Sequence, residues 1–461
     1  MSIPIFGLLK KEYLKEPKWW FISGLLAVSG LAVFLQASTL SVFLYFFTAL
    51  IFIATQIFLK HSLPIGLFQS VQAFGSGFYY YFENLFTIGN SAETKRKKVM
   101  KNVLLVLIPI LVAIIFLKLY QSADETFKAY TEWINLDWIS WGFLGFYLVL
   151  TLFLYGFFFS RKDPALTSWE ESLKNNIQPD YSDGIQRVVG VKNETKVAIG
   201  LLITLNAFLL LYNIIDVSFV TTKLFNHGFD TSYSQVVHGG INALITSIVL
   251  VILLLTYMFR GQLNFQGSKW LKIIAAVWLV QNLVMISTTL AKNWEYVAHW
   301  GLTYKRIGVF VYLFLAAIGI GLTLYKLFKV QSFWFLLRTT SLSFLTFFVF
   351  FACFSWDRII AEHNLTHVAK DRIDLDYILD LGSDALPALI EYHQTKGMDE
   401  FYEAELIDYA RYSRDRLASR EDRSTWRSTN LTDKYVLAEL RKWPESFGPY
   451  DDFRGMFSYD Y

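Results

Sequence analysis

Polar side chains inside the long apolar stretches of this 461-residue chain are the first candidates for chemistry. Asp216 lies near the end of one such stretch, and Asn206 and Asn213 precede it by ten and three residues. This spacing places all three side chains on one face of a helix. A carboxyl and two amides in one stripe are suited to a proton or ion site. The alternative is a buried polar seam that fixes helix packing, because unpartnered polar groups are costly in an apolar medium.

Two adjacent cations, Lys305 and Arg306, stand at the start of a later apolar stretch. The charge distribution of the chain places this segment on the external side of the membrane, where Lys and Arg are scarce. A fixed partner would explain why two cations stand there. We predict that Arg306 pairs with Asp216 at similar depth. Acids of the C-terminal segment and lipid phosphate are the alternative partners. His299, beside Trp300, is expected to anchor the same turn at the interface.

Other polar side chains have simpler explanations. Gln281 and Asn282 lie deep in an apolar stretch, where hydrogen bonds between helices, at roughly 1 kcal/mol each, account for them. His363 and His367 are four residues apart, but Asn364 stands where zinc hydrolases carry a catalytic glutamate. We therefore predict no metal site and no cofactor.

Motifs of the common enzyme classes are missing from the sequence. It has no G-x-S-x-G elbow, no P-loop, no G-x-G-x-x-G after a strand and no H-E-x-x-H helix. The single cysteine, Cys353, excludes an intramolecular disulfide. We expect that the protein is not an enzyme.

Composition identifies the elements that must position these residues. Hydrophobic residues make up 54% of the chain and charged residues only 18%. Residues 356–461 hold 14 of the 42 Lys and Arg and 22 of the 39 Asp and Glu. The sequence therefore predicts a multi-spanning membrane domain at 1–355 and an acidic, soluble tail at 356–461. This pattern gives no indication of nucleic-acid binding.

A transmembrane helix needs about 20 mostly apolar residues. Nine stretches qualify, so we predict an all-α polytopic fold of about nine transmembrane helices. The predicted spans are 19–36, 40–59, 102–120, 139–159, 197–217, 241–259, 270–290, 307–325 and 334–355.

The distribution of Lys and Arg predicts the orientation. With the N-terminus in the cytoplasm, the inner segments hold 22 basic residues and the outer connections hold 6. Nine spans then place the tail outside the cytoplasm. The aromatic segment 62–89 is long enough to cross, but Pro64, Gly66, Glu83 and other polar residues interrupt it, so we interpret it as an interfacial helix; a re-entrant segment is the open alternative.

The tail shows helical periodicity rather than low complexity. Apolar residues at three- and four-residue spacing predict helices over 375–381 and from 386 onward, with Ser383 or Asp384 as a cap between them. Further helices are predicted at 399–418 and at 432–442, the last capped by Thr432 or Asp433. A helical tail of this size is small, so we expect it to dock on the membrane domain.

Several short motifs resemble landmarks of an uncharacterised bacterial inner-membrane family, DUF4173, which is close to DUF4153. They are Gly301-Leu302-Thr303 followed by Arg306-Ile307, the Asn364 segment, the run from Asp376 to Leu381, and Trp426-Arg427-Ser428 with Asn430-Leu431. The resemblance covers spans five to nine and the tail, whereas the first 190 residues are too generic to match. It implies a multi-spanning bacterial membrane protein with a soluble C-terminal region, and it implies no reaction.

Together these features predict an interaction, sensory or scaffold protein of the bacterial inner membrane. Its tail and the 299–306 turn would form one external surface, whose partners are the lipid bilayer and a second protein. The alternative is a secondary transporter that uses Asp216 as a coupling acid. No pair of broken spans in two halves is visible, which weighs against transport.

Overall fold

The computed structural model describes residues 15–57, 62–69, 71–72, 164–177, 191–226, 233–259, 263–266, 269–423 and 430–443, with isolated residues between 109 and 146. Within these ranges the structure is helical, with one isolated β-bridge between Asn176 and Gln331. The predicted all-α class is therefore confirmed for the described part of the chain. Contacts divide the chain into two compact units, Met1–Trp19 with Leu50–Glu170 and Trp20–Ala49 with Glu171–Tyr461.

In the first unit the described residues are few. Trp19, near the start of α2 (Pro17–Gln36), lies 6.0 Å from the ring of Phe52 in α3 (Thr39–Ile57). The backbone N–H of Ser62 donates to the Glu170 carboxylate of α8 (Pro164–Ser172) over 2.5 Å.

Three predictions for this unit lie largely outside the described residues. The spans predicted at 102–120 and 139–159 fall there, as does most of the interfacial helix predicted at 62–89, of which 63–69 is helical. These three assignments stay predictions.

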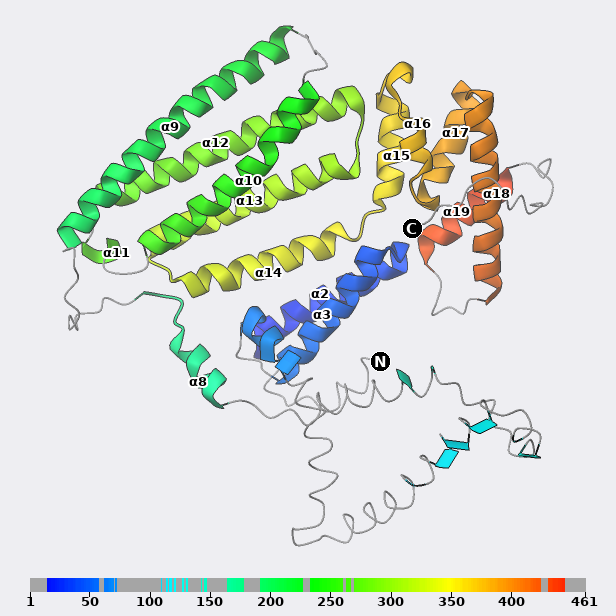
Figure 1. Ribbon diagram of the computed structural model, residues 1–461, viewed down its shortest axis with the longest axis horizontal. Helices are drawn as coiled ribbons and strands as arrows, with labels where there is room; N and C mark the ends of the chain where they lie inside the picture. Colours follow the sequence, from blue (N-terminus) through cyan, green and yellow to red (C-terminus); the bar gives the residue numbers. More distant parts are fainter. Residues whose placement is uncertain are drawn as a thin grey trace. The chain divides into compact units, whose positions relative to one another are not determined.

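The second unit contains a group of long apolar helices (Figure 1). They are α9 (Val191–Asn226), α10 (Tyr233–Met258), α12 (Lys269–Trp300), α13 (Tyr304–Lys329) and α14 (Phe333–Phe351), with a short α11 (Leu263–Gln266) between α10 and α12. Helix α12 packs against α9, α10 and α13, and α13 also packs against α10 and α14. Their shared core is aliphatic, with Leu202, Leu279 and Ile320 fully buried at its centre.

Five described helices are long and apolar enough to cross a membrane: Pro17–Gln36, Asn193–Thr222, Lys269–Trp300, Tyr304–Lys329 and Phe333–Phe351. Shorter apolar helices occupy Thr39–Thr55 and Thr246–Met258, where two further spans are predicted. These are the features of a helical membrane protein. The count of nine spans stays a prediction.

Helices α9 and α12 exceed their predicted spans the most. Helix α9 covers 36 residues and α12 covers 32, where the sequence predicts spans at 197–217 and 270–290. Hydropathy ends a span at the first charges, whereas Lys, Glu and Ala continue a helix readily. Lys292 consequently belongs to α12 and not to a loop.

The tail forms a small helical bundle. Its helices are α15 (Trp356–His367), α16 (Leu375–Leu379), α17 (Leu386–Lys396), α18 (Glu400–Arg423) and α19 (Leu431–Lys442). Ile360, Ile378, Leu386 and Leu406 are fully buried in its core. The helical runs predicted from periodicity are confirmed.

The predicted caps of the tail helices are wrong. Helix α19 begins after Asn430, whose side chain accepts from the backbone N–H of Asp433 over 2.6 Å. Helix α17 begins after Ala385 without a side-chain cap, because the preceding residues form a 3-10 turn. Asn is as good a cap as Ser or Asp, so residue type alone does not select among neighbouring candidates.

The tail core continues into the ends of the long helices. Ile307 of α13 is buried in the same apolar cluster as Ile360 and Leu386. The Thr432 hydroxyl donates to the carbonyl of Leu35 in α2 over 2.8 Å, and the Gln36 amide donates to the carbonyl of Ala352. The predicted docking of the tail is therefore present in this unit.

Candidate functional site

A three-residue turn, Gly301–Thr303, joins α12 to α13, and three of the six predicted site residues, His299, Lys305 and Arg306, flank it. Gly301 has a φ of +81° and ends α12, since its N–H donates to the carbonyl of Val297 over 2.8 Å. Thr303 caps α13 by accepting from the N–H of Arg306. A positive φ favours glycine at this helix end.

Arg306 caps the C-terminus of α12. Its guanidinium donates to the carbonyl of Trp300 over 2.7 Å and to the carbonyl of Gly301. It also lies over the Tyr296 ring, 4.1 Å from the centroid. A cation is favourable here because the last carbonyls of a helix lack partners and carry partial negative charge. This role explains a cation at the turn without a carboxylate partner.

Asn364 of α15 holds the turn from the tail side. Its carbonyl oxygen accepts from the backbone N–H of Leu302 over 2.5 Å, and its amide donates to the Leu302 carbonyl over 2.9 Å. The Asn364 side chain thus gives hydrogen-bond partners to both the N–H and the carbonyl of Leu302, which lies outside any helix. Asn364 is 6% exposed, so water cannot easily replace it.

Further contacts join the turn to the tail. The Tyr304 hydroxyl donates to Asp357 over 2.5 Å, and the Tyr304 N–H donates to the Tyr377 hydroxyl over 3.0 Å. The guanidinium of Arg372 lies within 2.7 Å of His299 Nε2. His299, at the end of α12, is thus in contact with the tail. We call this set of contacts, from His299 to Arg306 on one side and the tail on the other, the turn–tail junction.

Gly301 and Gly397 give a matched pair of substitutions for the junction. Both have positive φ, +81° and +71°, so alanine strains either by about 1–3 kcal/mol. A Cβ at Gly301 would also lie 2.6 Å from the Asn364 carbonyl oxygen, whereas none of the surrounding atoms lies within 4 Å at Gly397. We expect Gly301→Ala to lower the thermal unfolding midpoint clearly more than Gly397→Ala, measured by scanning fluorimetry in detergent. Equal effects would show that Asn364 does not constrain the turn.

A half-buried acid lies close to the junction in the tail. Asp384 accepts from the Ser355 hydroxyl over 2.7 Å. Burial raises the pKa of Asp384 above its usual value, and the carboxylates of Asp357 and Asp433 raise it further, against the opposing effect of Ser355 and Arg358. The folded state therefore binds a proton at Asp384 more readily than the unfolded chain does.

The raised pKa predicts how stability depends on pH. The stability from Asp384 is fully present below its unfolded pKa and is lost as pH rises through the higher folded pKa. We expect Asp384→Asn to raise the tail's unfolding midpoint by a few degrees at pH 7, with the gain disappearing toward pH 4. Asp408→Asn, an exposed acid on α18, is the control. Thermal scans between pH 4 and pH 8 measure both, and a gain that grows on acidification would contradict the assignment.

A second cluster of predicted residues lies between α9 and α12. The Asn206 amide donates to the Ile274 carbonyl over 3.2 Å, and Gln281 donates to the Asn206 carbonyl oxygen over 2.9 Å. The Asn213 amide donates to the Gln281 carbonyl over 3.0 Å. Asn282 bonds back to Trp278 of its own helix. We call the interhelical contacts of Asn206, Asn213 and Gln281, with the ion pair described next, the α9–α12 seam.

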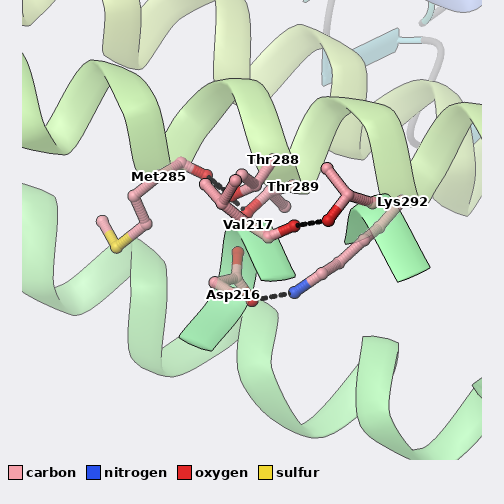
Figure 2. A network of polar contacts seen from close by, with 7 residues as sticks. Asp216, Val217, Met285, Thr288, Thr289 and Lys292 are labelled. Atoms are coloured by element: carbon pink, nitrogen blue, oxygen red, sulfur yellow. Dashed lines mark hydrogen bonds and ion pairs between the residues drawn. The ribbon is translucent and has the colours of Figure 1, made fainter. Parts of the chain in front are cut away.

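The charged end of the seam pairs Asp216 with Lys292 (Figure 2). The ammonium of Lys292 contacts the Asp216 carboxylate, and the two side chains are 14% and 9% exposed. Lys292 also lies 5.5 Å from the ring centroid of Phe219. Nearby, the Thr288 and Thr289 hydroxyls donate to the Met285 carbonyl of their own helix.

The predicted pair of Asp216 with Arg306 is therefore wrong. Asp216 is neutralised by Lys292, and Arg306 is used by the end of α12. Lys305 is exposed and has no ion pair within the described part of the chain. The cause of the error is the length of α12, whose charged last turns were counted as a connection.

One pattern in the sequence indicates the correct pair. Contacts between α9 and α12 rise together in residue number, from Asn206 with Gln281 to Asp216 with Lys292, so the two helices run parallel. The two polar residues are ten apart on α9 and eleven apart on α12. Similar spacing of polar side chains on two parallel helices is the signal for a shared seam.

The histidine pair of α15 lies beside the junction. The rings of His363 and His367 are stacked, with centroids 4.9 Å apart. Burial and the neighbouring His367 lower the pKa of His363. Among the described residues, no group of three or more His, Cys, Asp or Glu side chains is arranged to hold a metal ion. The prediction of no metal site stays a prediction.

Comparison with known proteins identifies a family. No curated protein and no solved structure matches the chain significantly. Residues 23–392 match the family described as a domain of unknown function, DUF4153. The match includes the first spans, which sequence motifs alone left unassigned, and ends before Trp426-Arg427-Ser428, which also lie outside the described residues. The matched segment covers well over half of this chain, and the chain therefore belongs to the DUF4153 family.

Proposed function

We propose that this protein is an interaction or sensory protein of the bacterial inner membrane, in which the tail receives the signal and the junction passes it to the spans. The observation that carries the proposal is the pair of hydrogen bonds between Asn364 and Leu302. Through them a displacement of α15 moves the connection between α12 and α13. In this proposal the chain crosses the membrane nine times, with the N-terminus in the cytoplasm and the tail outside it. We also propose that the chain is closer to the DUF4173 group than to other members of the family.

The tail offers an exposed surface for a protein partner. Phe401 and Tyr412 lie eleven residues apart on one face of α18 and are 67% and 51% exposed. Aromatic side chains are enriched in protein–protein interfaces, and Tyr is enriched among the residues that carry most of the binding energy.

Affinity purification of the tagged, full-length protein in a mild detergent tests the proposal. Quantitative mass spectrometry should find one partner at fixed stoichiometry with the wild type. The variant Phe401→Ser with Tyr412→Ser should lose it, and the control Leu431→Ser, an exposed residue of α19, should retain it. Deletion of α18 and α19 is a poor test, because it would remove Leu406 and Val436 from the tail core and so disrupt the fold of the tail. A partner-free wild type would contradict the interaction function.

The alternative function, secondary transport, has one observation in its favour. The second carboxylate oxygen of Asp216, Oδ2, is buried and has no hydrogen-bond partner in the described part of the chain. Against it, the Lys292 ammonium already occupies the Asp216 carboxylate, and the other contacts of the seam are hydrogen bonds that join α9 to α12. The α9–α12 seam therefore supports a packing role more than a transport site.

A further inference from the structure

A large apolar groove lies where the long helices meet the tail. It has a volume of about 910 Å³ and is lined by α12, α13, α14, the segment after α14 and one face of α15. This size falls within the range of roughly 300–1,000 Å³ that is typical of small-molecule sites. All but two of its lining residues are apolar.

Aromatic rings form most of the groove wall. Phe314 lies 5.2 Å from Phe347, and Phe351 stacks on Trp356 at 4.4 Å between ring centroids. Several wall residues are well exposed despite their size: Trp294 is 67% exposed and Phe314 is 53% exposed. A contiguous apolar surface of this kind marks a site that another apolar group covers.

The position of the groove indicates what covers it. Trp294, Phe314 and Phe347 belong to three of the helices that are long and apolar enough to cross a membrane. If these helices cross a bilayer, their exposed faces meet hydrocarbon, where lipid acyl chains are the abundant apolar groups. The walls present no carboxylate, hydroxyl or amide side chain in the described part of the chain, so they suit a chain that forms no hydrogen bonds.

The polar end of the groove is formed by imidazoles. His363 and His367 of α15 are its two lining residues with ionisable side chains among those described. The Nδ1–H of His367 donates to the His363 carbonyl, so its Nε2 can donate to a ligand when the ring is an imidazolium. A protonated imidazole is a charged donor that suits a phosphate.

We propose that this groove binds an anionic phospholipid of the bilayer, with an acyl chain along the aromatic wall and the phosphate at His363 and His367. The site would make one lipid a structural link between the long helices and the tail. It is independent of the partner surface on α18, so each proposal can fail without the other.

Photo-crosslinking of the full-length protein tests the proposal. The protein is reconstituted in phosphatidylcholine nanodiscs with a minor fraction of phosphatidylglycerol that carries a photoreactive acyl chain. Peptide mapping by mass spectrometry should place the label on residues 290–314 and 347–356. Ala298→Trp, which fills the groove from an exposed lining position, should reduce this labelling several-fold. Ala207→Trp, at an exposed alanine of α9 outside the groove, should leave it unchanged.

The headgroup assignment has its own variants. His363→Gln with His367→Gln should remove the preference for phosphatidylglycerol over a photoreactive phosphatidylcholine, and His393→Gln, a tail histidine outside the groove, should preserve it. Labelling of the groove no stronger than that of the exposed face of α9 at Ile214 and Ile215 would overturn the proposal. So would a dimer whose interface covers the groove peptides and excludes the label.

Discussion

Replacement of Asn364 by alanine is expected to release the turn at Leu302 and to destabilise the turn–tail junction by about 2–5 kcal/mol. The substitution leaves the N–H and the carbonyl of Leu302 without partners in a half-buried position. Each unsatisfied buried group costs roughly 1–3 kcal/mol, and the two costs add in the same state. Hydrogen–deuterium exchange in detergent measures the effect directly, because the Leu302 amide is one of the two groups.

We expect exchange at Leu302 to accelerate by a factor of about 30 or more, since each 1.4 kcal/mol corresponds to about a factor of ten. Thr366→Ala is the matched control on the same helix. Its exposed hydroxyl bonds back to Glu362, so its loss should change stability by no more than about 0.5 kcal/mol. Unchanged exchange over 301–304 in Asn364→Ala would show that the junction does not depend on this side chain.

The fold was largely predictable because long-range packing is not needed to recognise it. Hydropathy locates the apolar helices, and periodicity of residues such as Ile378 and Leu389 locates the tail helices. The ends of the helices were less predictable. A hydropathy window stops at Lys292 and Glu295, but the helix they belong to continues to Trp300 because nothing in that segment breaks it.

The contacts of the site residues were not predictable to the same degree. Asp216 and Arg306 were identified as residues that need partners, and both have them. His299 was expected to be an interfacial anchor, and it contacts Arg372 of the tail. The partner of Asp216 was wrong because depth was inferred from loop boundaries. The role of Arg306 as a helix cap was missed because a cation near an acid suggests an ion pair before it suggests backbone carbonyls.

The Asn364–Leu302 contact could not have been found from residue types. The two residues are 62 positions apart, and one partner is a backbone group, which every residue carries. The sequence shows only an asparagine in an amphipathic helix and a glycine in a turn. The contact between Asn364 and Leu302 depends on the packing of the tail against the first turn of α13. This packing buries Ile307 and brings the turn next to α15.

Removal of either charge of the Asp216–Lys292 pair is expected to cost about 3–5 kcal/mol of stability, because the remaining charge stays buried without a partner. Asp216→Asn leaves the ammonium beside α9, and Lys292→Met leaves the carboxylate, whose second oxygen already lacks a hydrogen bond in the described part of the chain. The midpoint of thermal unfolding in detergent reports both losses. Lys305→Met, which removes an exposed cation near the same end of the bundle, should change stability by no more than about 0.5 kcal/mol.

The double variant Asp216→Asn with Lys292→Met separates the two proposed functions. It removes both charges together, so it should recover most of the stability lost by either single change, and the coupling energy from the four proteins measures the pair. A packing role then predicts that the double variant still retains the partner bound through α18. A transport role predicts a folded protein without ion-coupled flux, because the seam would lack its titratable acid. Additive losses with no recovery would instead show that Asp216 and Lys292 do not interact in the folded protein.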